Sequence, residues 1–164
     1  MREIIQEVLP SFNSNKSFAL ATVTRTWSSA PRPVGAAMAV LDSGEVIGSV
    51  SGGCVEGAIH EASLEVLKTK ISQSVTYGVS DDNAFAVGLT CGGTIELYIQ
   101  YIDQATFPEF AEVADKIEDK QAVAVATLVN AKTGIGARIV LTKTEASGTL
   151  GNSQLDHAAI EGAR

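Results

Sequence analysis

The chain repeats part of its own pattern, and this repeat constrains the fold more than any other feature of the sequence. Three short segments recur in the same order at an offset of roughly 100 residues, which indicates structural repetition. The matches are Ala19–Val23 with Ala124–Leu128, Gly35–Val40 with Gly136–Leu141, and Gly48–Val50 with Gly148–Leu150. Each copy has three β-like runs followed by a helical pattern. We therefore predict an α+β fold of duplicated β-β-β-α units around a mixed sheet, in a single domain with half-repeats at about 18–68 and about 122–164.

Apolar periodicity and turn residues locate the individual elements. Val55, Ile59 and Val66 fall on one face of a helix, and Asp42-Ser43-Gly44 is typical of a hairpin turn. Pro108 suits the start of a later helix. The predicted helices span residues 1–9, 55–68 and 109–120, and the predicted strands span 18–26, 37–41, 45–49, 72–77 and 94–101.

Composition narrows the class of protein. The chain of 164 residues is 45% hydrophobic and carries a formal net charge of −7. Such an acidic chain lacks the cationic surface that binds phosphates, so we expect no nucleic-acid partner. No run reaches the roughly 18 apolar residues of a membrane span, and Glu3 and Glu7 interrupt what would be the apolar core of an export signal. Two cysteines form no disulfide framework, so we expect a cytoplasmic protein.

Both cysteines lie beside a Gly-Gly pair. Ser51-Gly52-Gly53-Cys54 precedes the predicted helix at 55–68, and Cys91-Gly92-Gly93 precedes the predicted strand at 94–101. Glycine lets the backbone approach a ligand closely, and the N–H groups of a first helical turn attract an anion. These residues are therefore candidates for ligand binding. The structural alternatives are that Cys54 is a small buried hydrophobe and that Cys91 only ends a loop.

Arg32 is a second candidate, because Pro31 and Pro33 stiffen the chain on both sides of it. A guanidinium mounted on a rigid loop binds a phosphate or carboxylate at a lower ordering cost. The alternative is a rigid turn that carries a solvated arginine.

Other site chemistries lack their defining residues. Neither CxxC nor HxxxH occurs, and His60 would face another side of the predicted helix than Cys54, so we expect no metal site built by protein ligands alone. The P-loop, Rossmann and Ser-His-Asp fingerprints are also missing, and we assign no catalytic residue.

Five segments together resemble the XdhC/CoxI family, whose members are accessory proteins of xanthine dehydrogenase and carbon monoxide dehydrogenase. The match runs in order from about residue 18 to 101 and is specific, because two glycine-cysteine motifs coincide with a Pro-Arg-Pro-x-Gly loop. The segments are Ala21–Val23, Ser29–Ala36, Gly48–Glu56, Tyr77–Gly78 and Gly88–Glu96. Beyond residue 101 the resemblance is looser.

The resemblance implies a maturation factor that binds the molybdenum cofactor (molybdopterin) as cargo and protects it. Such a factor assists sulfuration of the cofactor and its insertion into an apo-molybdoenzyme of the xanthine oxidase class, with a cysteine desulfurase-type sulfurase as a further partner. It binds and hands over its cargo without turnover. The implied cofactor-binding residues are Arg32, Ser51, Gly52, Gly53, Cys54, Cys91, Gly92 and Gly93.

Two alternatives stay open. A thiol-dependent sulfur or redox transferase would use Cys54 and Cys91 in turn, and one thiol would then alkylate rapidly near neutral pH. A non-catalytic scaffold between sulfurase and dehydrogenase would bind its partners equally well after Cys54→Ser. The chain also departs from the family pattern, because Ala37 stands where members often have a basic residue, whereas Arg138 is basic in the second copy. We expect no C-terminal Rossmann-like domain, and a homodimer.

Overall fold

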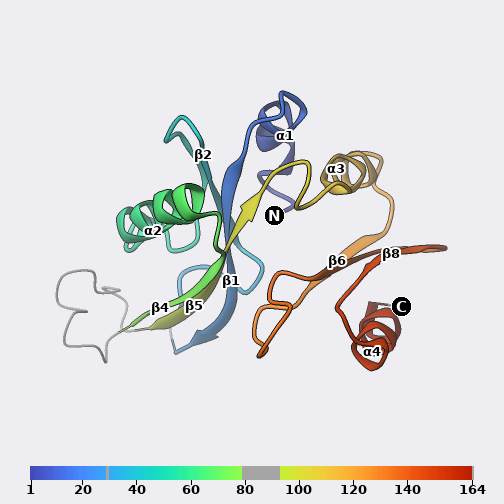
Figure 1. Ribbon diagram of the computed structural model, residues 1–164. Coiled ribbons are helices and arrows are strands. Elements are labelled where there is room, and N and C mark those ends of the chain that lie inside the picture. The colour runs from blue at the N-terminus through green and yellow to red at the C-terminus, as the bar shows by residue number, and fades with distance from the viewer. Residues whose placement is uncertain (29, 79–92, 164) are drawn as a thin grey trace. The chain divides into compact units, whose positions relative to one another are not determined.

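The computed structural model describes residues 1–28, 30–78 and 93–163, which divide into two compact units, Met1–Pro108 and Glu109–Arg164 (Figure 1). Among the described residues each unit has a sheet of its own together with two helices. The predicted α+β class is confirmed. The predicted mixed sheet is corrected to two sheets in which every described strand pair is antiparallel. Short turns at residues 42–45 and 143–145 can join only antiparallel strands, because a parallel pair needs a longer crossover.

The first unit is built around a five-stranded sheet in the order β3-β2-β1-β5-β4. The central strand β1 pairs with β2 on one side and with β5 on the other. Its residues Ala19, Ala21 and Val23 face one side of the sheet and belong to one hydrophobic cluster, as the two-residue period of a strand requires. The strands are β1 (Phe18–Trp27), β2 (Ala37–Leu41), β3 (Val46–Gly48), β4 (Gln73–Tyr77) and β5 (Thr94–Ile102).

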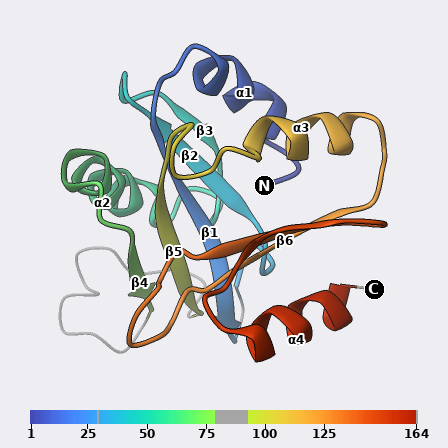
Figure 2. The ribbon, with the colours of Figure 1, turned by 45° about the vertical axis from the view of Figure 1, so that its right-hand side comes forward.

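Helix α2 (Glu56–Thr69) covers one face of this sheet and contacts β1, β2 and β5. Its residues Ile59 and Val66, with Val55 just before it, join the same hydrophobic cluster. Helix α1 (Ile5–Asn13) lies on the other side of the sheet from α2 in both views (Figures 1 and 2). It starts later than the sequence predicts, at Ile5, and it ends later because it continues through Pro10.

The second unit has a three-stranded sheet in the order β6-β7-β8. A small cluster centred on Ile139, Leu141 and Leu150 forms its core, against which Ile160 packs. No residue of α4 in the described part is fully buried. The elements are α3 (Phe110–Glu118), β6 (Val123–Thr127), β7 (Arg138–Thr142), β8 (Ala146–Thr149) and α4 (Ser153–Ala163).

The two units share strand register as well as element order. Thr22 of β1 pairs with Ala37, and the matching Thr127 of β6 pairs with Arg138. Gly48 pairs with Met38, and Gly148 pairs with Ile139 in the same way. The loops that join the first two strands also repeat, because the N–H groups of Val23 and Gly35 make the same hydrogen bonds as those of Leu128 and Gly136.

Candidate functional site

The motif segments of the first unit lie at one end of its sheet. Antiparallel pairing places the end of β1, the start of β2, the end of β3 and the start of β5 at the same end of the sheet. Arg32 lies on the loop between β1 and β2, and Ser51–Cys54 follows β3. Gly93 directly precedes β5, whose first residue Thr94 pairs with Trp27 at the end of β1. Cys91 and Gly92 lie outside the described residues.

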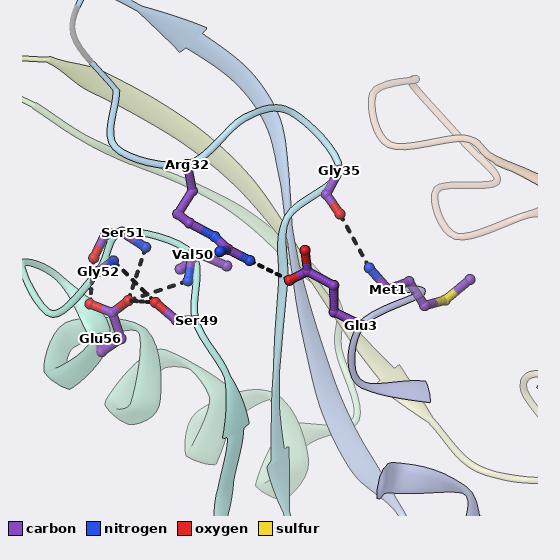
Figure 3. A network of polar contacts seen from close by, with 9 residues as sticks. All are labelled: Met1, Glu3, Arg32, Gly35, Ser49, Val50, Ser51, Gly52 and Glu56. Atoms are coloured by element: carbon purple, nitrogen blue, oxygen red, sulfur yellow. Dashed lines mark hydrogen bonds and ion pairs between the residues drawn. The ribbon is translucent and has the colours of Figure 1, made fainter. Parts of the chain in front are cut away.

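The loop of residues 49–56, which connects β3 to α2, is organised by the carboxylate of Glu56 (Figure 3). Oxygen Oε1 accepts hydrogen bonds from the Ser49 hydroxyl at 2.7 Å, from the Val50 N–H at 3.2 Å and from the Ser51 N–H at 2.9 Å. Oxygen Oε2 accepts from the Ser51 hydroxyl and from the Gly53 N–H, the latter at 2.8 Å. One side chain therefore binds four residues of the loop.

Two serine hydroxyls make further hydrogen bonds within the 49–56 loop. Ser51 is almost fully buried at 1% exposure, and its Oγ accepts a hydrogen bond from the Val55 N–H at 3.0 Å while donating to Glu56. The Ser49 hydroxyl accepts from the Gly52 N–H at 3.0 Å. The arrangement resembles a capping box, in which a hydroxyl and a carboxylate satisfy the open N–H groups at a helix start.

The hydrogen bonds to Glu56 keep it ionised. Burial by itself raises the pKa of its carboxyl group, but hydrogen bonds from Ser49 and Ser51 outweigh burial and lower the pKa from 4.5 to about 2. The 49–56 loop thus carries a permanent internal negative charge at neutral pH.

The internal carboxylate changes the expected role of the glycines. The sequence predicts Gly52 and Gly53 as backbone donors to a bound anion, whereas their N–H groups donate to Ser49 and Glu56. Sequence patterns alone did not assign Glu56 to the site. The signal that could have found it is the repeat itself, since an acid, Asp156, occupies the matching position of the second copy.

Cys54 lies two residues before the first residue of α2 and is half-buried. Its side chain packs against the hydrophobic cluster that also holds Val50, Val55 and Ile95. Cys54 is therefore in apolar contact while part of the residue stays accessible to solvent.

Arg32 does not stand alone on its loop, because its Nη2 forms an ion pair with Oε2 of Glu3 (Figure 3). The Glu3 side chain is 71% exposed and that of Arg32 is 33% exposed. Nitrogen Nε of Arg32 is buried and lacks a hydrogen-bond partner among the described residues. The Met1 nitrogen also donates to the Gly35 carbonyl at 3.2 Å, so the start of the chain holds the loop at two points.

Both candidate loops are anchored in one core. Ala30 and Ala36 flank the Arg32 loop, Val50 and Val55 flank Ser51–Cys54, and all four contribute to the same hydrophobic cluster. Within the described residues no group of three or more His, Cys, Asp or Glu side chains could hold a metal ion. No helix in the described part of the chain has the length and apolarity that crossing a membrane requires.

Comparison with known proteins identifies the family of the segment that holds the two candidate loops. Residues 12–78, which include both loops, match the family model described as XdhC and CoxI family. Residues 12–78 belong to the XdhC and CoxI family. The resemblance seen in the sequence is thereby confirmed.

Two curated relatives have similar sequences. The chain is 33% identical over 122 residues to the Molybdenum cofactor insertion chaperone PaoD of Escherichia coli (strain K12), a match that covers 74% of the chain and 37% of that protein. It is 30% identical over 106 residues to a probable xanthine dehydrogenase subunit of Bacillus subtilis (strain 168), covering 63% of the chain and 32% of that protein. The chain thus spans about a third of the length of these relatives.

A crystal structure described as a xanthine dehydrogenase from Bacillus halodurans has a similar fold. The TM-score is 0.75 at 19% sequence identity, over 90% of this chain and 44% of that chain. At this identity the likeness supports the fold alone.

Proposed function

We propose that this chain takes part in inserting the molybdenum cofactor into enzymes of the xanthine dehydrogenase type, and that its first unit binds the cofactor as cargo. One observation carries the proposal: the segment that matches the XdhC and CoxI family holds the Arg32 loop and the Ser51–Cys54 loop, and both lie at one end of one sheet. The similarity to a molybdenum cofactor insertion chaperone supports the same function.

The described residues suit an anionic cargo that also carries soft sulfur ligands. Arg32 would bind the terminal phosphate of the pterin, because its ion pair with Glu3 is exposed and such pairs contribute only about 0–1 kcal/mol. A phosphate also forms charge-assisted, bidentate contacts with a guanidinium and can replace the Glu3 carboxylate. The half-buried Cys54 would face the sulfur-rich part of the cargo. Gly52 and Gly53 would shape the loop, since their N–H groups already donate within it.

We extend the proposal to the finer functions that the family resemblance implies. The protein would protect the cofactor, assist its sulfuration and hand it over without turnover. Its partners would be an apo-molybdoenzyme of the xanthine oxidase class and a cysteine desulfurase-type sulfurase, in the cytoplasm, and the protein would act as a homodimer. Cys91 and Gly92, which lie outside the described residues, belong to the same proposed site together with Gly93.

An insertion assay tests this function. The chain, first loaded with cofactor under anaerobic conditions and then freed of unbound pterin, is mixed with an apo-molybdoenzyme of the xanthine oxidase class, and recovered enzyme activity is measured. The proposal expects the loaded chain to restore more activity than the same amount of free cofactor. Equal activation by the loaded chain and by the unloaded chain added with free cofactor would instead favour the scaffold hypothesis.

A further inference from the structure

We propose that Glu56 is a positioning residue of the candidate site: its carboxylate holds residues 51–54 in one conformation and thereby keeps the Cys54 thiol in place. The proposed function enters only in the further claim that this order improves retention of the cofactor. Control of the thiol by Glu56 stands on the contacts of the first unit alone.

The contacts of Glu56 separate into two sets when the two units are compared. The first set joins Glu56 to the Ser49 hydroxyl and the Val50 N–H. In the second unit Asp156 makes the same two contacts, with the Thr149 hydroxyl at 2.7 Å and the Leu150 N–H at 2.6 Å. These shared contacts join a strand end to the helix that follows it.

The second set of contacts is specific to the first unit. Glu56 also accepts hydrogen bonds from the N–H and hydroxyl of Ser51 and from the N–H of Gly53. In the second unit the Asn152 side-chain oxygen binds a different pair of N–H groups, those of Gln154 and Leu155, and Asp156 keeps only the strand-end contacts. The longer glutamate is therefore not needed to connect β3 to α2.

The extra reach of Glu56 acts on a stretch with little steric restraint. Gly52 and Gly53 have φ values of +72° and +110°, and a Cβ on either would meet nothing within 4 Å. Neighbouring side chains therefore do not restrain these glycines, and the hydrogen bonds to Glu56 and Ser49 supply the order. Cys54 follows directly, so we expect these bonds to fix its backbone while its side chain packs against the hydrophobic cluster.

The second unit also supplies a matched experiment. Glu56→Asp shortens the side chain by one methylene, and Asp156 shows that an aspartate at this spacing keeps the hydroxyl and N–H contacts at the strand end. Glu56→Asp therefore releases residues 51–53 while leaving the connection to α2 intact. Asp156→Glu, the reverse change in the second unit, is the control, and Glu56→Gln tests the charge.

Two measurements are made on the full chain without cofactor: the rate of iodoacetamide alkylation at Cys54, followed by peptide mass spectrometry, and the thermal midpoint. We expect Glu56→Asp to raise the alkylation rate about tenfold, which corresponds to losing about 1.4 kcal/mol of local order. Its thermal midpoint should stay close to that of the wild type. Asp156→Glu should leave the alkylation rate unchanged, and Glu56→Gln should raise it at least as much as Glu56→Asp does.

An unchanged alkylation rate in Glu56→Asp would overturn the proposal. A large fall of its thermal midpoint would also overturn it, because the contacts of Glu56 with residues 51–53 would then stabilise the whole fold rather than the loop alone. Pterin retention is measured separately, and Glu56→Asp should lower it several-fold. If the wild type binds no pterin, the proposed function fails while the alkylation result still decides the role of Glu56.

Discussion

Glu56 and Asp156 hold the same place in the two units of the chain. Each carboxylate accepts a hydrogen bond from the hydroxyl seven residues before it and from the N–H six residues before it. The residues between differ, because the first unit has Ser51-Gly52-Gly53-Cys54 where the second has Gly151-Asn152-Ser153-Gln154. The duplication thus separates a shared structural connection from the features that only the candidate site has.

The pH dependence of stability should report the charge on Glu56. Its pKa is about 2 in the folded chain and near 4.5 when unfolded, so its hydrogen bonds stabilise the fold above about pH 5. This contribution is lost as the pH falls from about 5 to about 2. The thermal midpoints of wild type and Glu56→Gln should therefore differ most near neutral pH and converge toward pH 2.

Asp103 also has a lowered pKa, but it does not change the difference between wild type and Glu56→Gln. Burial opposes ionisation of its carboxyl group, but hydrogen bonds from Thr106 and Ala105 lower its pKa, in the same direction as for Glu56. Both proteins contain Asp103, so its effect cancels in the difference. A difference in thermal midpoint that stays constant from pH 7 to pH 2 would contradict the low pKa of Glu56.

Gly48 should be intolerant of any side chain. Its φ is +84°, and a Cβ there would lie 2.6 Å from the carbonyl oxygen of Ala37 and 2.6 Å from Cγ2 of Ile4. Gly48→Ala should therefore cost about 1–3 kcal/mol of unfolding free energy. Gly57, at the start of α2, has open space around it, and Gly57→Ala should stabilise by about 0.5–1 kcal/mol. Urea unfolding of both variants measures these opposite signs.

Replacing Glu3 should separate the effect of Arg32 on stability from its effect on cofactor binding. The pair is exposed, so Glu3→Gln should change the unfolding free energy by about 1 kcal/mol or less. The same variant frees the guanidinium, and pterin retention should stay equal or rise. Arg32→Ala should lower retention with little change in thermal midpoint. If Arg32→Ala instead unfolds the first unit, Arg32 is a structural residue of the loop.

Cys54 should matter for cargo more than for stability. Cys54→Ser conserves size and replaces a soft thiol by a hydroxyl, and partial exposure limits the cost of the polar atom. Pterin retention should fall with little change in thermal midpoint. Cys54→Ala serves as the control for packing, because it keeps an apolar contact with the cluster. Retention equal to wild type in both variants would remove Cys54 from the proposed site.

Local patterns predicted the strands and the second helix of the first unit closely. The helix predicted at 55–68 is observed at Glu56–Thr69, and the strand predicted at 94–101 is observed at Thr94–Ile102. The hairpin around Asp42-Ser43-Gly44 joins β2 and β3 as expected. These features depend on residues close together in the sequence, where apolar period and turn chemistry act directly.

The parts that the sequence did not predict depend on long-range contacts. The ion pair of Arg32 with Glu3 joins residues far apart in the chain, and no period or motif encodes it. The use of Glu56 as an internal anion requires the loop to fold back on the helix start. The separation into two antiparallel sheets likewise follows from which strands pair, which composition and apolar period leave open.

Cofactor content tests the central claim most directly. The chain is purified anaerobically from a host that makes molybdenum cofactor, then oxidised, and the released pterin is quantified per mole of folded protein. We expect pterin close to one equivalent in the wild type and a several-fold lower content in Cys54→Ser and Arg32→Ala. Folded wild-type protein without pterin, even after added cofactor, would contradict the account.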